Sequence, residues 1–199
     1  MNHEDSKELP SHSYPTSEQI EAELRRVRNQ PSPKRTSIAP FIVLIITAAA
    51  VFLVNYMLLP VMKINGSSME PTLAEGNITI VLKTDHFERG DICCFYYDDR
   101  ILCKRIIGMP GDSVDIDEYG NVSVNGQTLS EPYVSEKSLE NCDIEFPFAV
   151  PENMYFVLGD NRPVSDDSRT SVIGCVRENR MIGKVIVCIW PFSDFGIPE

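Results

Sequence analysis

Histidine is scarce in this sequence, which holds three in 199 residues. His3 and His12 lie in the polar N-terminal stretch, and only His86 lies farther along the chain. A Ser-His-Asp triad and a His-rich metal site both need histidines beside other functional groups, so neither is expected. The six cysteines show no C-x-x-C spacing, which also argues against a zinc or thioredoxin-type site.

Basic residues are outnumbered: 18 Lys and Arg face 29 Asp and Glu, for a formal net charge of -11. Such an acidic chain is a poor match for a polyanion, so we expect no nucleic-acid partner. The length and the 43% hydrophobic content suit one packed domain with appended segments.

Charge is absent altogether from residues 39–62, APFIVLIITAAAVFLVNYMLLPVM. A spanning helix needs about 20 apolar residues, so this stretch predicts a transmembrane helix. A buried helix of a soluble protein is one alternative. A cleaved signal peptide is another, but its apolar region is shorter, about 7–15 residues, and lies nearer the start.

The flanks of this stretch predict its orientation. Lys63 is the first basic residue after this stretch. Five basic residues lie shortly before it: Arg25, Arg26, Arg28, Lys34 and Arg35. The positive-inside rule then places the N-terminus in the cytoplasm. We expect a cytoplasmic polar tail over 1–38, a single transmembrane helix over 39–62 in the plasma membrane, and an extracytoplasmic domain over 63–199. Within the tail, the capping-box spacing of Thr16 and Gln19 predicts a short helix near residues 18–28.

No long helical period follows residue 62. Seven segments there are instead rich in Val, Ile, Tyr and Phe and are bounded by turn residues: 77–83, 91–97, 100–108, 113–117, 121–126, 154–160 and 181–190. This pattern predicts a mainly β fold, with an antiparallel β-sheet domain after the N-terminal helix.

One lysine is suited to act as a base. In RILCKRIIG (100–108), strand alternation places Lys104 on the same face as Leu102 and Ile106, while Arg105 points the other way. Burial among apolar neighbours lowers a lysine pKa from its usual ~10.4, which makes the neutral amine available. The alternative is an ordinary strand lysine whose ammonium reaches solvent.

Two loops hold residues that could act together with Lys104. NGSSMEPTL (65–73) places Ser67 and Ser68 in a turn bracketed by Gly and Pro, and taken alone such a stretch is typical of a linker. GDNRPVSDDSR (159–169) is dense in donors and acceptors, as solvated loops are, and it lacks the spacing of a calcium loop.

Five blocks in order carry a resemblance: GSSMEPTL (66–73), RGDICCF (89–95), KRIIGMPGD (104–112), GDNRPVSDDSR (159–169) and IGKVIVCIWPF (182–192). Together they resemble the type I bacterial signal peptidases, in the single-anchor, Gram-positive-like branch. The resemblance implies a Ser/Lys dyad in which Ser68, not Ser67, is the nucleophile and Lys104 is the general base. It also implies that the backbone N–H of Ser68 stabilises the oxyanion.

The resemblance gives roles to the second loop as well. Ser165 matches the serine that hydrogen-bonds the lysine amine. Asp167 and Arg169 match the buried pair that braces the site, and Asp160 lies in the same block. Some members add a second oxyanion donor where this chain has Gly66, so the second donor is left open.

The implied function is a membrane-anchored serine endopeptidase that removes N-terminal signal peptides, with small residues at -1 and -3, from exported preproteins. The implied chemistry needs no metal or organic cofactor, and its partners are preproteins and the lipid bilayer. Three alternatives stay open: a dedicated peptidase with few secreted or pilin substrates, a self-cleaving protease of the LexA type, and an inactive tethered paralogue.

Two further features have open interpretations. If Asp98-Asp99 forms a two-residue hairpin loop, Cys94 lies opposite Cys103, either as a disulfide or as buried thiols. Four rings lie in Pro-bounded stretches near the C-terminal half of the domain: Phe146, Phe148, Trp190 and Phe192. Each suits the core, but a site close to a bilayer also needs apolar surface, so we expect Trp190 or Phe192 to touch lipid.

Overall fold

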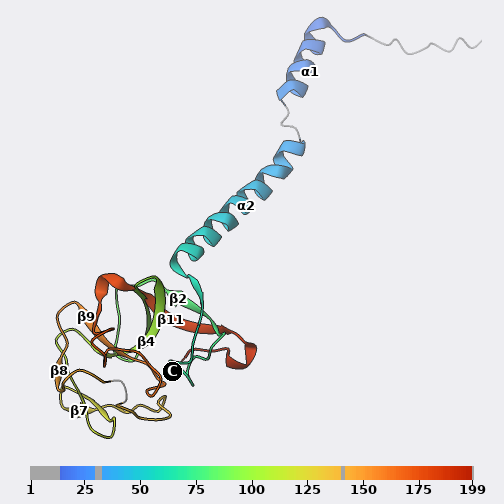
Figure 1. Ribbon diagram of the computed structural model, residues 1–199. Coiled ribbons are helices and arrows are strands. Elements are labelled where there is room, and N and C mark those ends of the chain that lie inside the picture. Colours follow the sequence, from blue (N-terminus) through green and yellow to red (C-terminus); the bar gives the residue numbers. More distant parts are fainter. Residues whose placement is uncertain (1–13, 30–32, 140–141, 199) are drawn as a thin grey trace, which may run out of the picture. The chain divides into compact units, whose positions relative to one another are not determined.

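The structure is a computed structural model that describes residues 14–29, 33–139 and 142–198. The chain divides into two compact units, Met1–Phe52 and Leu53–Glu199, and all strands among the described residues belong to the second unit (Figure 1).

The first helix, α1 (Ser17–Asn29), confirms the helix expected from the capping-box spacing. The Thr16 backbone N–H donates to Gln19 Oε1 at 3.0 Å, which satisfies one of the amides that a helix start leaves unpaired. Helix α2 (Pro33–Leu58) follows, and its residues Ile38–Leu58 are long and apolar enough to cross a membrane.

The predicted end of that helix at residue 62 is corrected by the structure. Helix α2 ends at Leu58, and Val61–Lys63 form the first strand, β1. Pro60 has no N–H to continue a helix, and its carbonyl instead accepts from the Val81 N–H at 2.9 Å. The chain thus passes from helix to sheet within a few residues.

Eleven strands make up the described part of the second unit, and its only helical elements after Leu58 are two short 3-10 turns, Glu178–Arg180 and Phe192–Asp194. The strands after β1 are β2 (Ile78–Leu82), β3 (Ile92–Tyr97), β4 (Arg100–Gly108), β5 (Ser113–Ile116), β6 (Val122–Val124), β7 (Gln127–Thr128), β8 (Phe148–Ala149), β9 (Met154–Leu158), β10 (Val176–Arg177) and β11 (Met181–Trp190). The seven predicted strands are all present, and the four that the sequence did not reveal have two or three residues each.

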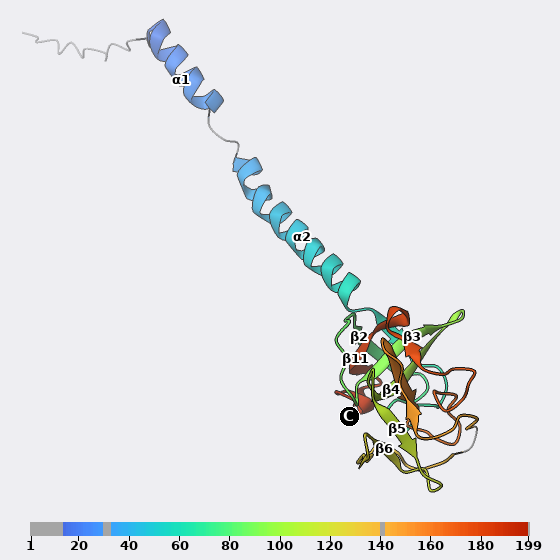
Figure 2. The same ribbon diagram turned by 90° about the vertical axis from the view of Figure 1, so that its left-hand side faces the viewer.

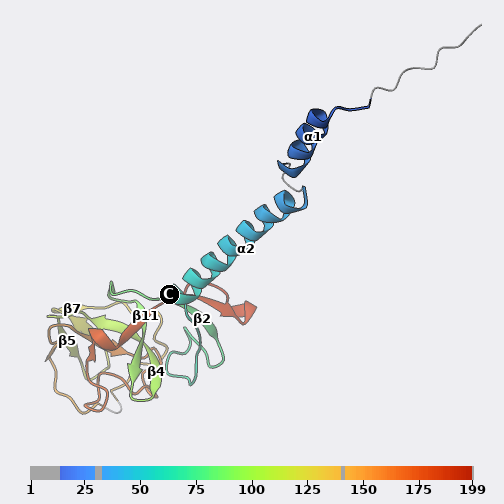
Figure 3. The same ribbon diagram turned by 90° about the horizontal axis from the view of Figure 1, so that it is seen from above.

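These strands form two antiparallel sheets, as the mainly β prediction required. The large sheet has the order β1-β2-β11-β3-β4-β9-β10, and the small sheet has the order β7-β6-β5-β8. Figure 2 shows the β5–β6 hairpin beyond β4, and the view from above places the small sheet on the side away from β2 (Figure 3). Apolar clusters fill the spaces between the sheets and their loops.

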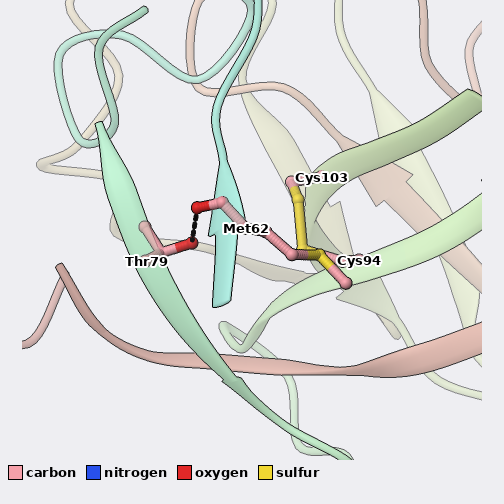
Figure 4. The surroundings of a disulfide bond; sticks show 4 residues. All are labelled: Met62, Thr79, Cys94 and Cys103. Carbon is pink, nitrogen blue, oxygen red and sulfur yellow. Dashed lines mark hydrogen bonds between the residues drawn. A yellow bond between two sulfur atoms is a disulfide. The ribbon is translucent and has the colours of Figure 1, made fainter. Parts of the chain in front are cut away.

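The turn between β3 and β4 fixes the register of the strand that carries Lys104. Tyr97 pairs with Arg100, so the loop has the two predicted residues, and Asp98 takes the positive φ of 48° that such turns need. Cys94 therefore faces Cys103, and the two form a disulfide. The sequence was compatible with either a disulfide or two free thiols at this pair, and the structure shows the disulfide (Figure 4).

Candidate active site

Ser68 lies in a tight turn between β1 and β2. The Glu70 N–H donates to the Ser67 carbonyl at 3.1 Å, and the Leu73 N–H donates to the Met69 carbonyl at 2.8 Å. Met69 and Leu73 are buried, at 1% and 0% exposure, and they anchor the turn in an apolar cluster. This anchoring leaves Ser68 itself half-buried, at the surface of the domain.

The loop 159–169 packs directly on this turn. Asn161 makes two contacts: its backbone N–H donates to the Ser68 carbonyl and its side-chain amide donates to the Ser67 carbonyl, each at 3.1 Å. Gly159 also has to be a glycine, since a Cβ there would lie 2.5 Å from the Ser68 carbonyl oxygen and 2.1 Å from Ser165 Oγ. The serine turn, Gly159 and Ser165 therefore meet at one point.

Lys104 is buried, with 3% of its surface exposed, on β4 opposite the fully buried Cys93. Burial lowers the pKa of Lys104 from 10.5 to about 8, against the opposing effect of the Asp167 and Asp166 carboxylates. Burial also raises the pKa of Cys93 to about 12, so this neighbour is a neutral thiol. Lys104 is thus the interior lysine that strand alternation predicted, rather than one that reaches solvent.

Ser165 is also interior, at 1% exposure, and its hydroxyl has no hydrogen-bond partner within the described ranges. A buried polar group without a partner costs about 1–3 kcal/mol. Such a hydroxyl is available to form a hydrogen bond. The Ser68 hydroxyl and the Lys104 amine share no hydrogen bond in the part of the chain that the structure describes, and catalytic contacts of this kind commonly tighten only with substrate.

Arg169 and Asp167, to which the resemblance gave a bracing role, form a buried ion pair. Arg169 Nε lies 2.8 Å from Asp167 Oδ1, with both side chains fully buried, and Asp167 Oδ2 accepts the Gly159 N–H at 3.0 Å. The guanidinium of Arg169 also donates to the Arg162 carbonyl at 2.7 Å. This network fixes the loop from which Gly159 and Ser165 reach the serine turn.

Asp160 pairs with Arg105, the residue after Lys104 on β4. Two hydrogen bonds join them, at 2.9 Å and 2.7 Å, and the same guanidinium reaches Thr72 Oγ1 in the serine turn at 3.5 Å. Strand alternation predicted that Arg105 points away from Lys104, and its guanidinium pairs with the Asp160 carboxylate. The strand of the lysine, the loop and the serine turn are therefore tied together by one buried ion pair.

Two residues in the segment after β7, Glu131 and Tyr133, contact buried arginines of the site and were not predicted from the sequence. Glu131 pairs with the buried Arg162, and the Tyr133 ring lies 3.9 Å from the Arg105 guanidinium carbon. The only local signal was the isolated Glu-Pro-Tyr at 131–133, which has no strand or helix period.

A cleft of about 740 Å³ opens beside Ser68. Its lining comes from two stretches, 62–66 with Ser68 and Met69 on one side and 99–103 on the other. β1 is an edge strand, and β4 pairs with β9 only from Arg105 onward, so residues 100–104 pair only with β3 within the described sheets. Both walls of the cleft thus carry strand edges that can accept an extended peptide.

The family model described as signal peptidase, peptidase S26, matches residues 35–190, which include the serine turn, Lys104 and the loop 159–169. The chain belongs to this family.

Similar proteins with names are signal peptidases as well. The chain is 35% identical over 164 residues to signal peptidase I of Bacillus licheniformis, which covers 76% of this chain and 87% of that protein. It is also 36% identical over 169 residues to signal peptidase IB of Staphylococcus aureus strain Mu50, and this alignment covers 72% of this chain and 84% of that protein. A crystal structure of a signal peptidase I from Enterococcus faecalis V583 is 35% identical and covers 50% of this chain and 96% of that one, with a TM-score of 0.41.

Family membership settles the class of reaction. The chain is a signal peptidase, a serine endopeptidase that acts on the signal peptides of preproteins.

The buried pair of Arg169 and Asp167 is expected to stabilise the fold around the site. Arg169→Met leaves the Asp167 carboxylate buried without its partner, which costs about 3–5 kcal/mol of unfolding free energy. Arg89→Met removes one partner of the surface pair Arg89–Asp112 and is expected to cost at most about 1 kcal/mol. Urea unfolding of both variants, followed by circular dichroism, measures the difference, and equal losses would contradict it.

Proposed function

We propose that the chain is a membrane-anchored signal peptidase in which Ser68 is the nucleophile and Lys104 is the general base. The observation that carries this proposal is the burial of Lys104, with a pKa lowered to about 8, beside a loop that contacts the Ser68 turn. At pH 7 about a tenth of such lysines are neutral, whereas an exposed lysine is almost entirely charged.

The reaction runs in two halves. Neutral Lys104 takes the hydroxyl proton as Ser68 Oγ attacks the scissile carbonyl, and the resulting ammonium gives that proton to the leaving amine. A water then gives a proton to Lys104 while its oxygen attacks the acyl-enzyme, and that proton returns to Ser68 Oγ as the acid product leaves. The Ser68 backbone N–H donates to the oxyanion, and donors of this kind stabilise the transition state by about 2.7–4 kcal/mol.

The loop 159–169 supports this dyad. The unpaired Ser165 hydroxyl is the natural partner for the Lys104 amine, because a hydrogen bond would satisfy one polar group and orient the other. Asp167 with Arg169, and Asp160 with Arg105, hold this loop against the serine turn. Their proposed role is to keep donors and acceptors in place, without contact with the substrate.

The cleft supports an extended substrate. A preprotein segment that adds to β1 and to residues 100–104 of β4 receives backbone hydrogen bonds from both walls. Side chains of an extended peptide alternate, so the residues at -1 and -3 point to the same side. That side is the wall of the cleft with Met62 and Met69, which favours small residues there.

Helix α2 supplies the anchor. Five basic residues before the apolar stretch orient it with the N-terminus in the cytoplasm and the catalytic unit outside, as a single span of the plasma membrane. The ten residues from Leu58 to Ser68 reach at most about 35 Å, so the serine works near the bilayer surface.

Exposed aromatic side chains supply a second membrane contact. Trp190 and Phe192 are 50% and 78% exposed, with ring centroids 5.2 Å apart, and Phe195 and Ile197 beyond them are exposed as well. Phe146 and Phe148, by contrast, pack around Phe156 in an apolar cluster. An amphipathic Trp beside apolar side chains is typical of residues at a membrane interface.

Substitution of each of the two adjacent serines distinguishes the proposed nucleophile, Ser68, from its neighbour, Ser67. Ser68→Ala is expected to lower kcat/KM on a preprotein by at least about 10⁴-fold, because the attacking oxygen is lost. Ser67→Ala is expected to stay within about tenfold of wild type, since Ser67 contacts Asn161 and Glu70 through its backbone carbonyl. An active Ser68→Ala enzyme would exclude this mechanism.

The base has a pH signature. The rate is expected to rise with pH through an apparent pKa of about 8, because only the neutral form of Lys104 accepts the proton. Lys104→Arg is expected to be as inactive as Lys104→Ala, since arginine keeps its charge at these pH values. A flat rate from pH 6 to 10, or activity in Lys104→Arg, would remove Lys104 from this role.

The membrane contact is tested by fluorescence, because Trp190 is the only tryptophan. In a soluble form that lacks residues 1–58, lipid vesicles are expected to shift the Trp190 emission to the blue as the exposed ring leaves water. Phe192→Ser is expected to weaken the shift by removing the neighbouring ring. Unchanged emission with vesicles present would show that Trp190 does not enter the interface.

A further inference from the structure

The turn that follows β7 holds two side chains that pack against the candidate site. The Val134 N–H donates to the Glu131 carbonyl at 3.1 Å, which closes a four-residue turn with Pro132 at its second position. Proline fixes its own φ and restricts the residue before it, so the backbone of Glu131 has little freedom. Glu131 is buried and Tyr133 is half-buried. Among the described residues that line the cleft beside Ser68, neither is found, so any effect on the reaction passes through other side chains.

The Tyr133 ring covers the guanidinium of Arg105. The guanidinium carbon lies 3.9 Å from the ring centroid, a distance at which an aromatic face attracts a cation. The N–H groups of this guanidinium donate to both carboxylate oxygens of Asp160, to the Gly90 carbonyl at 2.9 Å and to Thr72 Oγ1 at 3.5 Å. Arg105 is only 3% exposed, so the ring takes the place of water on a face that its acceptors leave uncovered.

Glu131 holds a second buried arginine, Arg162. Glu131 Oε1 accepts from Arg162 Nη2 at 2.5 Å, and Oε2 accepts from Nη1 at 3.5 Å. Arg162 Nε in turn donates to the Gly159 carbonyl at 3.0 Å. The Tyr133 hydroxyl donates to Glu131 Oε1 at 3.3 Å and thereby joins the two arginine contacts. Burial and the Glu131 carboxylate both raise the pKa of Tyr133, so the phenol keeps its proton for this bond.

The two arginines hold adjacent residues of the loop that contacts the serine turn. Arg162 holds Gly159, whose backbone lies against that turn, and Arg105 holds Asp160. Arg105 also follows Lys104 on β4 and reaches the serine turn through one further hydrogen bond. A displacement of these two guanidinium groups would therefore move the serine turn relative to Lys104.

We propose that Tyr133 and Glu131 are positioning residues for the peptidase reaction, which hold Arg105 and Arg162 so that the serine turn stays in reach of Lys104. A misplacement of about 1 Å between reacting groups can lower a rate by about 100-fold. The inference rests on the proposed function, because it assumes that the serine turn and Lys104 react together. It assigns to Tyr133 and Glu131 an effect on the chemical step, with no contact to the substrate.

Tyr133→Leu is the central test, measured as kcat and KM on one preprotein with the full-length protein in lipid nanodiscs. Loss of the ring is expected to lower kcat by about 10- to 100-fold and to leave KM within about twofold of wild type, since the cleft is unchanged. Tyr133→Phe keeps the aromatic face over Arg105 and is expected to keep kcat within about threefold of wild type.

Glu131→Gln tests the second contact and serves if Tyr133→Leu folds poorly. The amide oxygen can still accept from Arg162, but the bond loses its charge and about half its strength. The expected result is a kcat lowered by about 3- to 10-fold with KM near the wild-type value. A wild-type kcat in Glu131→Gln would remove Glu131 from this role.

Two controls separate positioning from a general loss of stability. Phe148→Leu also removes a half-buried ring, whose centroid lies 5.8 Å from that of Phe156 in an apolar cluster. Urea unfolding is expected to show losses of similar size in Phe148→Leu and Tyr133→Leu, whereas kcat is expected to stay within about threefold of wild type in Phe148→Leu. In an Arg105→Lys background, which lacks the planar guanidinium, Tyr133→Leu is expected to lower kcat by no more than about threefold.

Four results would overturn the inference: a wild-type kcat in Tyr133→Leu, equal losses in Tyr133→Phe and Tyr133→Leu, an equal loss of kcat in Phe148→Leu, or an undiminished effect of Tyr133→Leu in the Arg105→Lys background. Failure of the wild-type protein to cleave any preprotein, or cleavage by Ser68→Ala, would instead overturn the proposed function.

Discussion

The site depends on the exclusion of water from Lys104. Burial destabilises its ammonium, but the nearby Asp167 carboxylate acts in the opposite direction and favours the charge. Arg169 resolves this conflict, because it pairs with Asp167 at 2.8 Å and its own positive charge lowers the pKa of Lys104. The buried Arg–Asp pair therefore contributes to the lowered pKa of the proposed base, in addition to fixing the loop. A carboxylate left unpaired at this position would return the lysine toward its charged form.

The burial of Lys104, the proposed base, also constrains Ser68, the proposed nucleophile. Lys104 belongs to the interior of β4, so the serine has to be brought to it by a separate segment that stays accessible to substrate. Gly159 and Asn161 provide the connection, since their backbone lies against the Ser68 carbonyl and Ser165 adjoins Gly159 on the other side. The absence of a side chain at Gly159 is what permits the three segments to approach so closely. The same loop thus contributes to the surroundings of Lys104 and contacts the turn that holds Ser68.

The parts that could be predicted from the sequence were those governed by local rules. The alternation of Leu102, Lys104 and Ile106 on β4 indicated an interior lysine because side chains in strands have a period of two. The Cys94–Cys103 register followed from a two-residue turn, but whether the bond forms depends on surroundings that sequence does not contain. Glu131 and Tyr133 could not be found, because they reach Arg162 and Arg105 across long separations from a segment without periodicity. The end of helix α2 was placed too late because apolar residues suit both a membrane helix and an edge strand.

The unpaired strand edges beside Ser68 are the last element that the chemistry requires. An exposed edge is normally a liability, since it can pair with another chain. Here residues of β1 and residues 100–103 of β4 line one cleft. Lys63 and Arg100 place charges at these edges, and charges of this kind disfavour indiscriminate pairing. The same strand that buries Lys104 at its centre leaves the edge of its first residues unpaired by β9, so the proposed base and the proposed peptide-binding edge are held in a fixed relation by one continuous strand.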